Sequence, residues 1–157
     1  MMDLIPILGK GNKRGYEDFL DCSITYCLTD GQHILPCYIS GNYKENSKLS
    51  IHNLEAHLDL INGKSMGGEG FIVTNHQKLY GAAEILSPYT IDRLVESVGD
   101  SFWIIPSSVH EVIVYPDNGE DPERFRRIIK SMNELLNPNE VLSNNVWKFS
   151  DGKIQIA

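Results

Sequence analysis

The residue types best suited to chemistry in this sequence fall in one short segment. Ser107, Ser108, His110 and Glu111 lie within five consecutive positions that follow a proline. A hydroxyl, an imidazole and a carboxylate are the side chains of a hydrolase triad. In an extended strand Ser108 and His110 would share one face while Glu111 pointed to the other, so a triad would need a carboxylate from elsewhere. The simpler interpretation is that the two serines satisfy backbone groups at a kink in the strand.

His110 is expected to have a structural role. In an extended strand it shares a face with Ser108, Val112 and Val114, and two of these neighbours are apolar. A buried imidazole needs a hydrogen-bond partner, and burial disfavours its charged form. We therefore predict a largely buried, neutral ring that is bonded to a backbone carbonyl or a side-chain hydroxyl on an adjacent element.

The three cysteines are candidate metal ligands. Cys22, Cys27 and Cys37 would need His33 or His57 as a fourth ligand for zinc. Only the first two cysteines approach the spacing of a zinc knuckle, and a separation of five residues in a strand points them to opposite faces. We therefore interpret them as buried thiols in a reducing compartment, and expect no metal and no cofactor.

A second candidate binding feature is a basic surface on the helix that we predict over 121–136. Arg126 and Lys130 accompany two further arginines on its outer side. Such a patch can meet an acidic partner or a phosphate, although a solvated helix face is the simpler interpretation. The binding residues that we name from the sequence are Ser107, Ser108, His110, Arg124 and Arg127.

Composition narrows the classes of partner. The 157 residues carry 14 lysines and arginines against 21 aspartates and glutamates, a net charge of -7. Because affinity for nucleic acid comes from cations that neutralise phosphates, we expect no direct nucleic-acid binding. No apolar run approaches the roughly 18 residues of a membrane span, and the N-terminus does not resemble a signal peptide. We therefore expect a cytoplasmic protein with a protein partner and no membrane contact, and leave its oligomeric state open.

The elements around these residues predict an α+β fold. Apolar stripes at helical spacing predict three helices, over 51–62, 90–98 and 121–136. Runs rich in β-formers and bounded by turn residues predict strands over 3–8, 19–29, 32–39, 71–75, 79–86, 102–105, 109–115, 146–149 and 153–156. We expect a mixed or mainly antiparallel sheet of five to seven strands, with about three helices packed on one of its faces.

The length of the chain favours a single domain over 1–157. We divide it into an N-terminal region of a hairpin and a helix, 1–66, and a core, 67–157. The stretch 63–70 contains four glycines in eight residues, which predicts a flexible joint between the two regions.

Three blocks of the second half carry a resemblance to known proteins. They are GAAEIL at 81–86, FWIIPSSVHEVIV at 102–114 and EVLSN at 140–144. In order and spacing they resemble an uncharacterised bacterial family of domains of unknown function, abundant in gut anaerobes and often encoded near mobile elements, with an ILPSSIHEVL-type motif. The resemblance covers about residues 70–150, and Asn144 departs from the aspartate usual in the family. It implies a shared fold unit and no particular reaction, and it draws attention to segment 106–111.

These observations favour a non-enzymatic cytoplasmic binding or regulatory protein. We expect it to be encoded by a phage or another mobile element and to act on a host partner, for example as an inhibitor of a host defence nuclease. One alternative is a small hydrolase that uses Ser108 and His110. The other is a structural or self-associating accessory domain, which would add strands at the Asp151-Gly152 hairpin or at the edge near Pro36.

Overall fold

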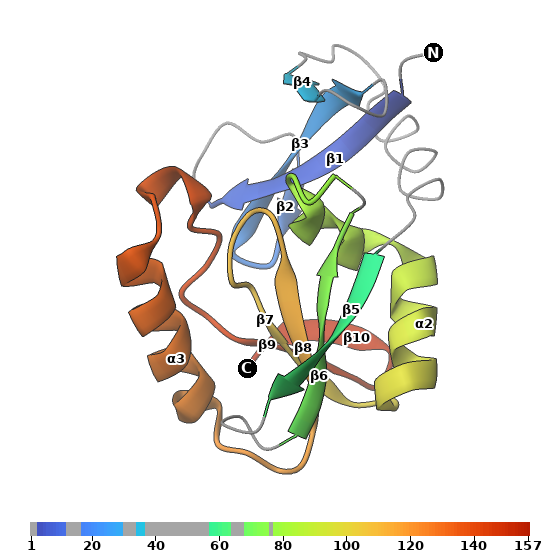
Figure 1. The fold of residues 1–157 in the computed structure, drawn as a ribbon, viewed down its shortest axis with the longest axis vertical. Helices are drawn as coiled ribbons and strands as arrows, with labels where there is room; N and C mark the ends of the chain where they lie inside the picture. Colours follow the sequence, from blue (N-terminus) through green and yellow to red (C-terminus); the bar gives the residue numbers. More distant parts are fainter. Residues whose placement is uncertain (1–2, 12–16, 30–33, 37–56, 64–67, 76) are drawn as a thin grey trace.

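The computed structural model describes residues 3–11, 17–29, 34–36, 57–63, 68–75 and 77–157. Its strands form two sheets in which every described pair is antiparallel, so the predicted α+β fold class is confirmed (Figure 1). The described helices are the 3-10 helix η2 (Gly81–Leu86), α2 (Pro88–Val98), α3 (Pro122–Leu135) and the 3-10 helix η3 (Pro138–Glu140). None of these is long and apolar enough to cross a membrane.

The N-terminal sheet is built around β3 (Cys22–Thr29). This strand pairs along its whole length with β1 (Asp3–Lys10), and it also pairs with β2 (Glu17–Phe19) and β4 (Ile34–Pro36). The strand predicted over 3–8 is confirmed, and so is the predicted pairing of the hairpin, with β4 as the described part of the returning strand. The first strand of that hairpin, predicted over 19–29, begins only at Cys22, because Phe19 ends β2 and residues 20 and 21 form a turn. The predicted turn of that hairpin, Asp30-Gly31, lies outside the described residues.

The larger sheet has six strands in the order β10-β9-β7-β8-β6-β5, a number within the predicted range. Its members are β5 (His57–Gly63), β6 (Gly68–Thr74), β7 (Phe102–Ile105), β8 (Val112–Pro116), β9 (Trp147–Ser150) and β10 (Lys153–Ile156). A second, separate sheet was not predicted.

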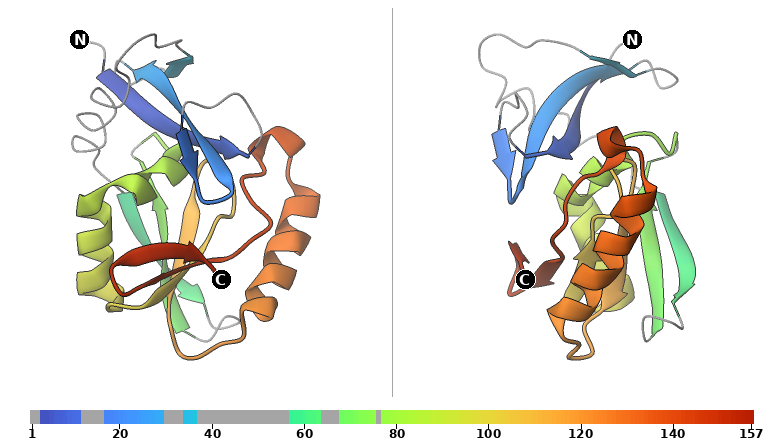
Figure 2. Two further views of the ribbon diagram at one scale, coloured as in Figure 1. Left: turned by 180° about the vertical axis from the view of Figure 1, so that it is seen from behind. Right: turned by 90° about the vertical axis from the view of Figure 1, so that its left-hand side faces the viewer.

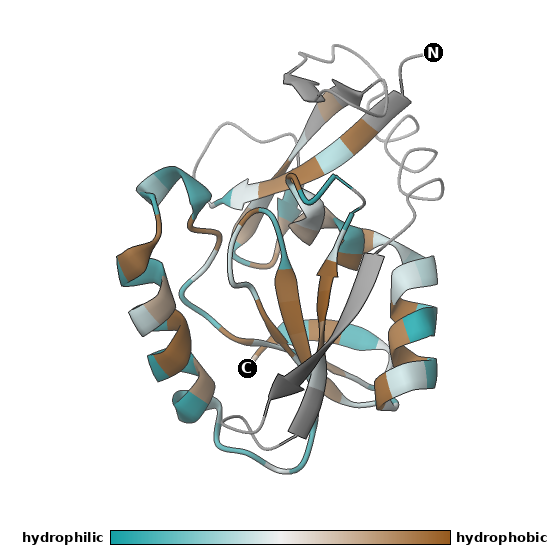
Figure 3. Ribbon diagram, in the orientation of Figure 1, coloured by the Kyte–Doolittle hydropathy of each residue, from teal (hydrophilic) through white to brown (hydrophobic). Residues whose placement is uncertain are grey.

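Both faces of the six-stranded sheet are covered, which the four residues of β7 make clear. Phe102 and Ile104 belong to a buried cluster that includes residues of η2 and α2. Trp103 and Ile105, which alternate with them, belong to a second cluster built with α3. The expectation of one covered face was therefore wrong, since α2 and α3 lie on opposite sides of the sheet (Figures 1 and 3).

The N-terminal sheet packs onto the same core as α2. Leu8, Cys22 and Ile24 are buried in one cluster with Val73 of β6 and Ala82 of η2. The sheet lies across one end of the larger sheet (Figure 2). This packing joins elements that are far apart in the sequence into one core.

The helix predicted over 51–62 is wrong where it can be compared with the structure. Residues 57–63 form β5, while 51–56 lie outside the described residues. Leu58 and Leu60 alternate with polar positions as well as fitting a helical stripe, so the pattern was compatible with both periods. The glycine-rich stretch predicted as a joint connects two paired strands, because Gly63 and Gly68 form the last register pair of β5 and β6.

The strand predicted over 79–86 is also wrong, because 81–86 form η2. Gly81 explains the difference. A Cβ at this position would lie 2.6 Å from the Asn75 backbone nitrogen and 2.8 Å from the His110 carbonyl oxygen. The buried group of Gly81, Ala82 and Ala83 therefore brings the backbone of η2 against two other segments, which larger side chains would prevent.

Local signals at the other ends of elements were more reliable. Asp121 accepts a hydrogen bond from the Glu123 backbone N–H and caps α3, as predicted. In α2 the N-cap is Ser87, three residues before the predicted Thr90, and Gly99 follows the helix with a φ of 110°. The C-terminal hairpin is confirmed, with Asp151 and Gly152 both at positive φ.

Candidate functional site

Segment 106–111 is the six-residue loop that connects β7 to β8 and is not part of a strand, so the strand predicted over 109–115 begins only at Val112. Ser107 donates through its hydroxyl to the Glu111 carbonyl at 3.1 Å. Ser108 Oγ accepts from the His110 backbone N–H at 3.0 Å. Both hydroxyls thus bond to backbone groups, as the structural interpretation of the serines predicted.

The His110 ring is held at both nitrogens. Nδ1 accepts from the Tyr80 backbone N–H at 2.9 Å, and Nε2 lies 3.5 Å from Glu140 Oε1. Because Nδ1 accepts, the ring proton of this neutral tautomer is on Nε2, facing the carboxylate. The side chain is 25% exposed. The prediction of a carbonyl or hydroxyl partner was wrong, since the partners are an amide N–H and a carboxylate.

The geometry brings the predicted triad residues near one another without connecting them for catalysis. Within this described segment, Ser108 Oγ is hydrogen-bonded to the His110 main chain and not to its ring. Both ring nitrogens face other groups, so neither is directed at the hydroxyl as a general base. Glu111 contributes its carbonyl to the turn. The carboxylate beside the imidazole is that of Glu140, a residue that was not predicted to belong to the site.

The same segment anchors its surroundings through its backbone. Val109 donates to the Glu140 carbonyl at 2.9 Å and accepts from the Ala82 N–H at 3.3 Å. The Thr74 hydroxyl donates to the His110 carbonyl at 2.7 Å. Segment 106–111 therefore ties β6, η2 and η3 together, which is a structural role.

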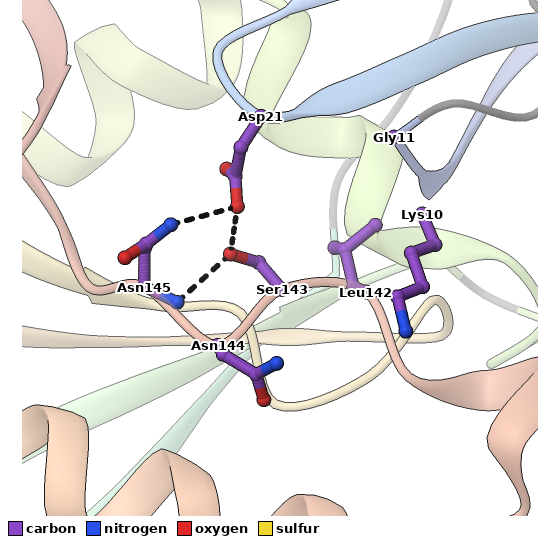
Figure 4. A pocket seen from close by; sticks show the side chains of 7 residues that line it. All are labelled: Lys10, Gly11, Asp21, Leu142, Ser143, Asn144 and Asn145. Atoms are coloured by element: carbon purple, nitrogen blue, oxygen red, sulfur yellow. Dashed lines mark hydrogen bonds between the residues drawn. The ribbon is translucent and has the colours of Figure 1, made fainter.

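A pocket lies where the N-terminal sheet meets the loop before β9 (Figure 4). Its volume is about 170 Å³. We call it the Asp21 pocket. It is lined by Lys10, Gly11, Asp21, Leu142, Ser143, Asn144 and Asn145. Leu20 and Asp21 form the turn between β2 and β3, with Leu20 at a φ of 54°, and this turn carries Asp21 to the loop.

The Asp21 carboxylate accepts hydrogen bonds at both oxygens. Oδ1 accepts from the Trp147 indole N–H at 3.0 Å and lies 3.9 Å from the Cys22 thiol. Oδ2 accepts from the Ser143 hydroxyl and from the Asn145 amide at 3.1 Å. Burial, followed by the adjacent Asp21 charge, raises the pKa of the Cys22 thiol, so this sulfur stays protonated. Asp21 is therefore a structural wall of the pocket.

Two other lining residues, Lys10 and Asn144, have side-chain nitrogen atoms that donate no hydrogen bond to the described residues. The exposed side chain of Lys10 makes no ion pair within the described part of the chain. Asn144 Oδ1 accepts from the Asn133 amide at 2.9 Å, which orients the Asn144 amide and leaves its Nδ2 without an acceptor among the described residues. The pocket thus presents unused donors beside a carboxylate whose acceptor capacity is already filled.

The predicted basic surface on α3 is only partly exposed. Arg126 pairs with Glu123 and donates to the Ala157 carbonyl. Arg124 and Arg127 are exposed, as their selection as binding candidates requires. Nothing in the described contacts connects them with the Asp21 pocket.

The cysteines do not form a described metal site. Cys22 and Cys27 are buried thiols, not joined in a disulfide, five residues apart in β3, while Cys37 and His33 lie outside the described residues. His57 is the first residue of β5. Among the residues that the structure places, no group of three or more histidine, cysteine, aspartate or glutamate side chains is arranged to hold a metal ion.

Sequence reasoning also missed a buried carboxyl group. Glu84 in η2 is 2% exposed, and its Oε2 has no hydrogen-bond partner. The nearby Ser87 and Thr90 hydroxyls are buried and unpartnered as well. Burial raises the pKa of Glu84 to about 7. In the sequence, Glu84 is a single acidic residue in an otherwise apolar segment, 81–86, and this pattern does not indicate that its carboxyl group is buried.

Comparison with known proteins identifies the family. Residues 37–151 match the model of a family of unknown function, DUF5688. The match begins well before residue 70, so the family resemblance extends further toward the N-terminus than predicted. Searches among curated proteins and among solved structures gave no match. The chain therefore belongs to DUF5688, a family of unknown function.

Proposed function

We propose that this chain is a non-enzymatic binding or regulatory protein that acts by engaging a protein partner. One observation carries the proposal. The side chains best suited to chemistry, in segment 106–111, are engaged in internal hydrogen bonds, whereas the Asp21 pocket presents unused donors at the surface. Side chains committed to the scaffold favour a structural role, and free polar groups around a recess favour recognition.

The proposed partner is a protein of the cell in which the chain is made, and the proposed location is the cytoplasm. The net charge of -7 opposes direct contact with nucleic acid and favours a partner with a basic surface. A host defence nuclease, whose substrate groove is basic, is an example of such a partner. As part of the same proposal, the chain is encoded by a phage or another mobile element.

A capture experiment tests this function. The full chain would be immobilised and exposed to host lysate at low salt, alongside the Lys10→Ala/Asn144→Ala double variant and a Lys153→Ala control. We expect a protein that the wild type and the control retain and the double variant loses. Retention of the same proteins by all three chains, or of none, would contradict the proposal.

The hydrolase alternative has its own test. A fluorophosphonate probe labels serines that an adjacent base activates. We expect no labelling of the wild-type chain, because the ring of His110 is engaged elsewhere. Labelling that disappears in Ser108→Ala would replace the binding proposal with a Ser/His-dependent hydrolase.

Self-association through β10 is a second candidate, favoured by a specific observation. β10 is the last strand in the described order of its sheet. The Ala157 N–H donates to the Val146 carbonyl, so the backbone groups of Ile154 and Ile156 point away from β9, toward the free edge. Ile156 is also 46% exposed. Strand addition by a second copy would pair these groups.

Sedimentation at increasing concentration distinguishes this candidate. Self-association through β10 predicts a dimer that Ile156→Lys abolishes, with Asp92→Ala, an exposed position on α2, as a control that retains it. A wild-type chain that stays strictly monomeric at high concentration removes this candidate and leaves the binding proposal in place.

A further inference from the structure

The unused donors of the Asp21 pocket define a chemical preference. Lys10 contributes an ammonium group and Asn144 an amide N–H₂, and neither has an acceptor in the described part of the chain. Both residues line this one pocket, Lys10 from the end of β1 and Asn144 from the loop before β9 (Figure 4). Donors without acceptors that line the same recess are suited to an oxygen-rich, negatively charged group.

Asp21 does not satisfy these donors. Its two oxygens already accept from Trp147, Ser143 and Asn145, and Cys22 lies beside them. Lys10 forms no ion pair with it within the described residues. The oxygens of Asp21 are occupied by donors of the same molecule, so the ammonium group of Lys10 is left for a ligand.

We propose that the Asp21 pocket binds a carboxylate group, with one oxygen on the Lys10 ammonium and the other on the Asn144 amide. The volume of about 170 Å³ suits a single group of this size. Phosphate is the less favoured oxyanion, because it is usually held by several backbone N–H groups or a bidentate arginine, and the described lining contains no arginine. This inference rests on the proposed function: on a partner whose surface is basic overall, it names the one acidic group, a carboxylate, that the pocket would recognise.

Titration of the full ¹⁵N-labelled chain tests the inference. The probes are N-acetylglycine, its uncharged analogue N-acetylglycinamide, and inorganic phosphate. We expect N-acetylglycine alone to shift the Asn144 side-chain amide and the Gly11 backbone amide, with saturation in the millimolar range and weakening at high salt. Lys10→Gln should weaken binding at least tenfold, whereas the control Lys153→Gln should leave it unchanged.

Each outcome decides the inference. An equal response to N-acetylglycinamide, a response to phosphate alone, or unchanged affinity in Lys10→Gln overturns it. Unaltered dispersion in the spectrum of Lys10→Gln shows that any loss is not unfolding. Absence of carboxylate binding together with partner capture overturns this inference only, while carboxylate binding without a captured partner removes the proposed function only.

Discussion

Segment 106–111 and the Asp21 pocket use polar residues in opposite ways. The segment concentrates serine, histidine and glutamate in five positions, and its hydroxyls and imidazole all bond to groups of the same molecule. The pocket gathers ordinary residues from the N-terminal sheet and from the loop before β9, and two of them keep donors unused. The difference shows that, when a binding site is sought, the type of a polar residue is less informative than whether its donors and acceptors are already used within the molecule.

The largest expected effect concerns the wall of the pocket. Asp21→Ala removes the acceptor of the Trp147 indole N–H and of two other donors, so we expect the free energy of unfolding to fall by about 3–5 kcal/mol. Urea unfolding measures it, with the exposed Asp92→Ala as a control that changes by about 0.5 kcal/mol or less. A loss below about 1 kcal/mol for Asp21→Ala would mean that the carboxylate does not hold the two sheets together.

The buried carboxyl group of Glu84, whose Oε2 has no partner, is a third way in which this molecule uses a polar residue. Burial raises the pKa of Glu84 from 4.5 to about 7, so its ionisation destabilises the folded state. The penalty is absent below pH 4.5, grows as the pH rises toward 7, and reaches about 3 kcal/mol above it. Glu84→Gln should therefore stabilise the chain by about this amount at pH 8 and leave its stability almost unchanged at pH 4.

Denaturant unfolding at the two pH values measures the effect of Glu84→Gln. Glu96→Gln, an exposed residue on α2, serves as the matched control and should show no such pH dependence. Equal stabilisation by Glu84→Gln at both pH values would mean that the stability change comes from the shape of the side chain and not from the ionisation of Glu84.

His110 tests whether segment 106–111 is structural. His110→Ala leaves the Tyr80 backbone N–H without its acceptor and opens a small cavity, so we expect a loss of about 1–3 kcal/mol. Thermal unfolding should show a melting temperature lower by several degrees. A shift under about 1 °C is smaller than even a 1 kcal/mol loss should give, and would count against the structural role.

The smallest expected effect on stability is at the free donor of the pocket. Lys10→Gln should change the free energy of unfolding by about 0.5 kcal/mol or less, because this side chain is exposed and makes no described ion pair. Thermal unfolding measures the change. A larger loss of stability would mean that Lys10, like His110, supports the fold and is not a free donor for a ligand.

Local signals explain what the sequence could predict. The cap at Asp121 and the turn at Asp151-Gly152 depend on a few neighbouring residues, and both were identified. The segments β5 and η2 were misassigned because their conformations depend on distant contacts. Gly81 lies in η2 because its backbone packs on the carbonyl of His110, which is 29 residues further along the chain.

The candidate site was less predictable than the fold. The residues of segment 106–111 were selected for their types, but the direction of each hydrogen bond depends on Tyr80 and Glu140. Asp21 gave no signal, because its partners lie 122 to 126 positions further along the chain. Only a structure reveals that a solitary aspartate in a turn meets an indole from the penultimate strand.

That distance has a consequence for the order in which the chain folds during synthesis. Trp147 follows Asp21 by 126 positions, which at about 5–20 residues per second corresponds to a delay of roughly 6–25 s. Until then the N-terminal sheet, with the buried Leu8, Cys22 and Ile24, lacks the two large aromatic side chains of its core that β9 supplies, Trp147 and Phe149. The core that the N-terminal sheet shares is therefore completed only when β9 has been made, and during this interval the incomplete core leaves the nascent chain exposed to aggregation and to chaperones.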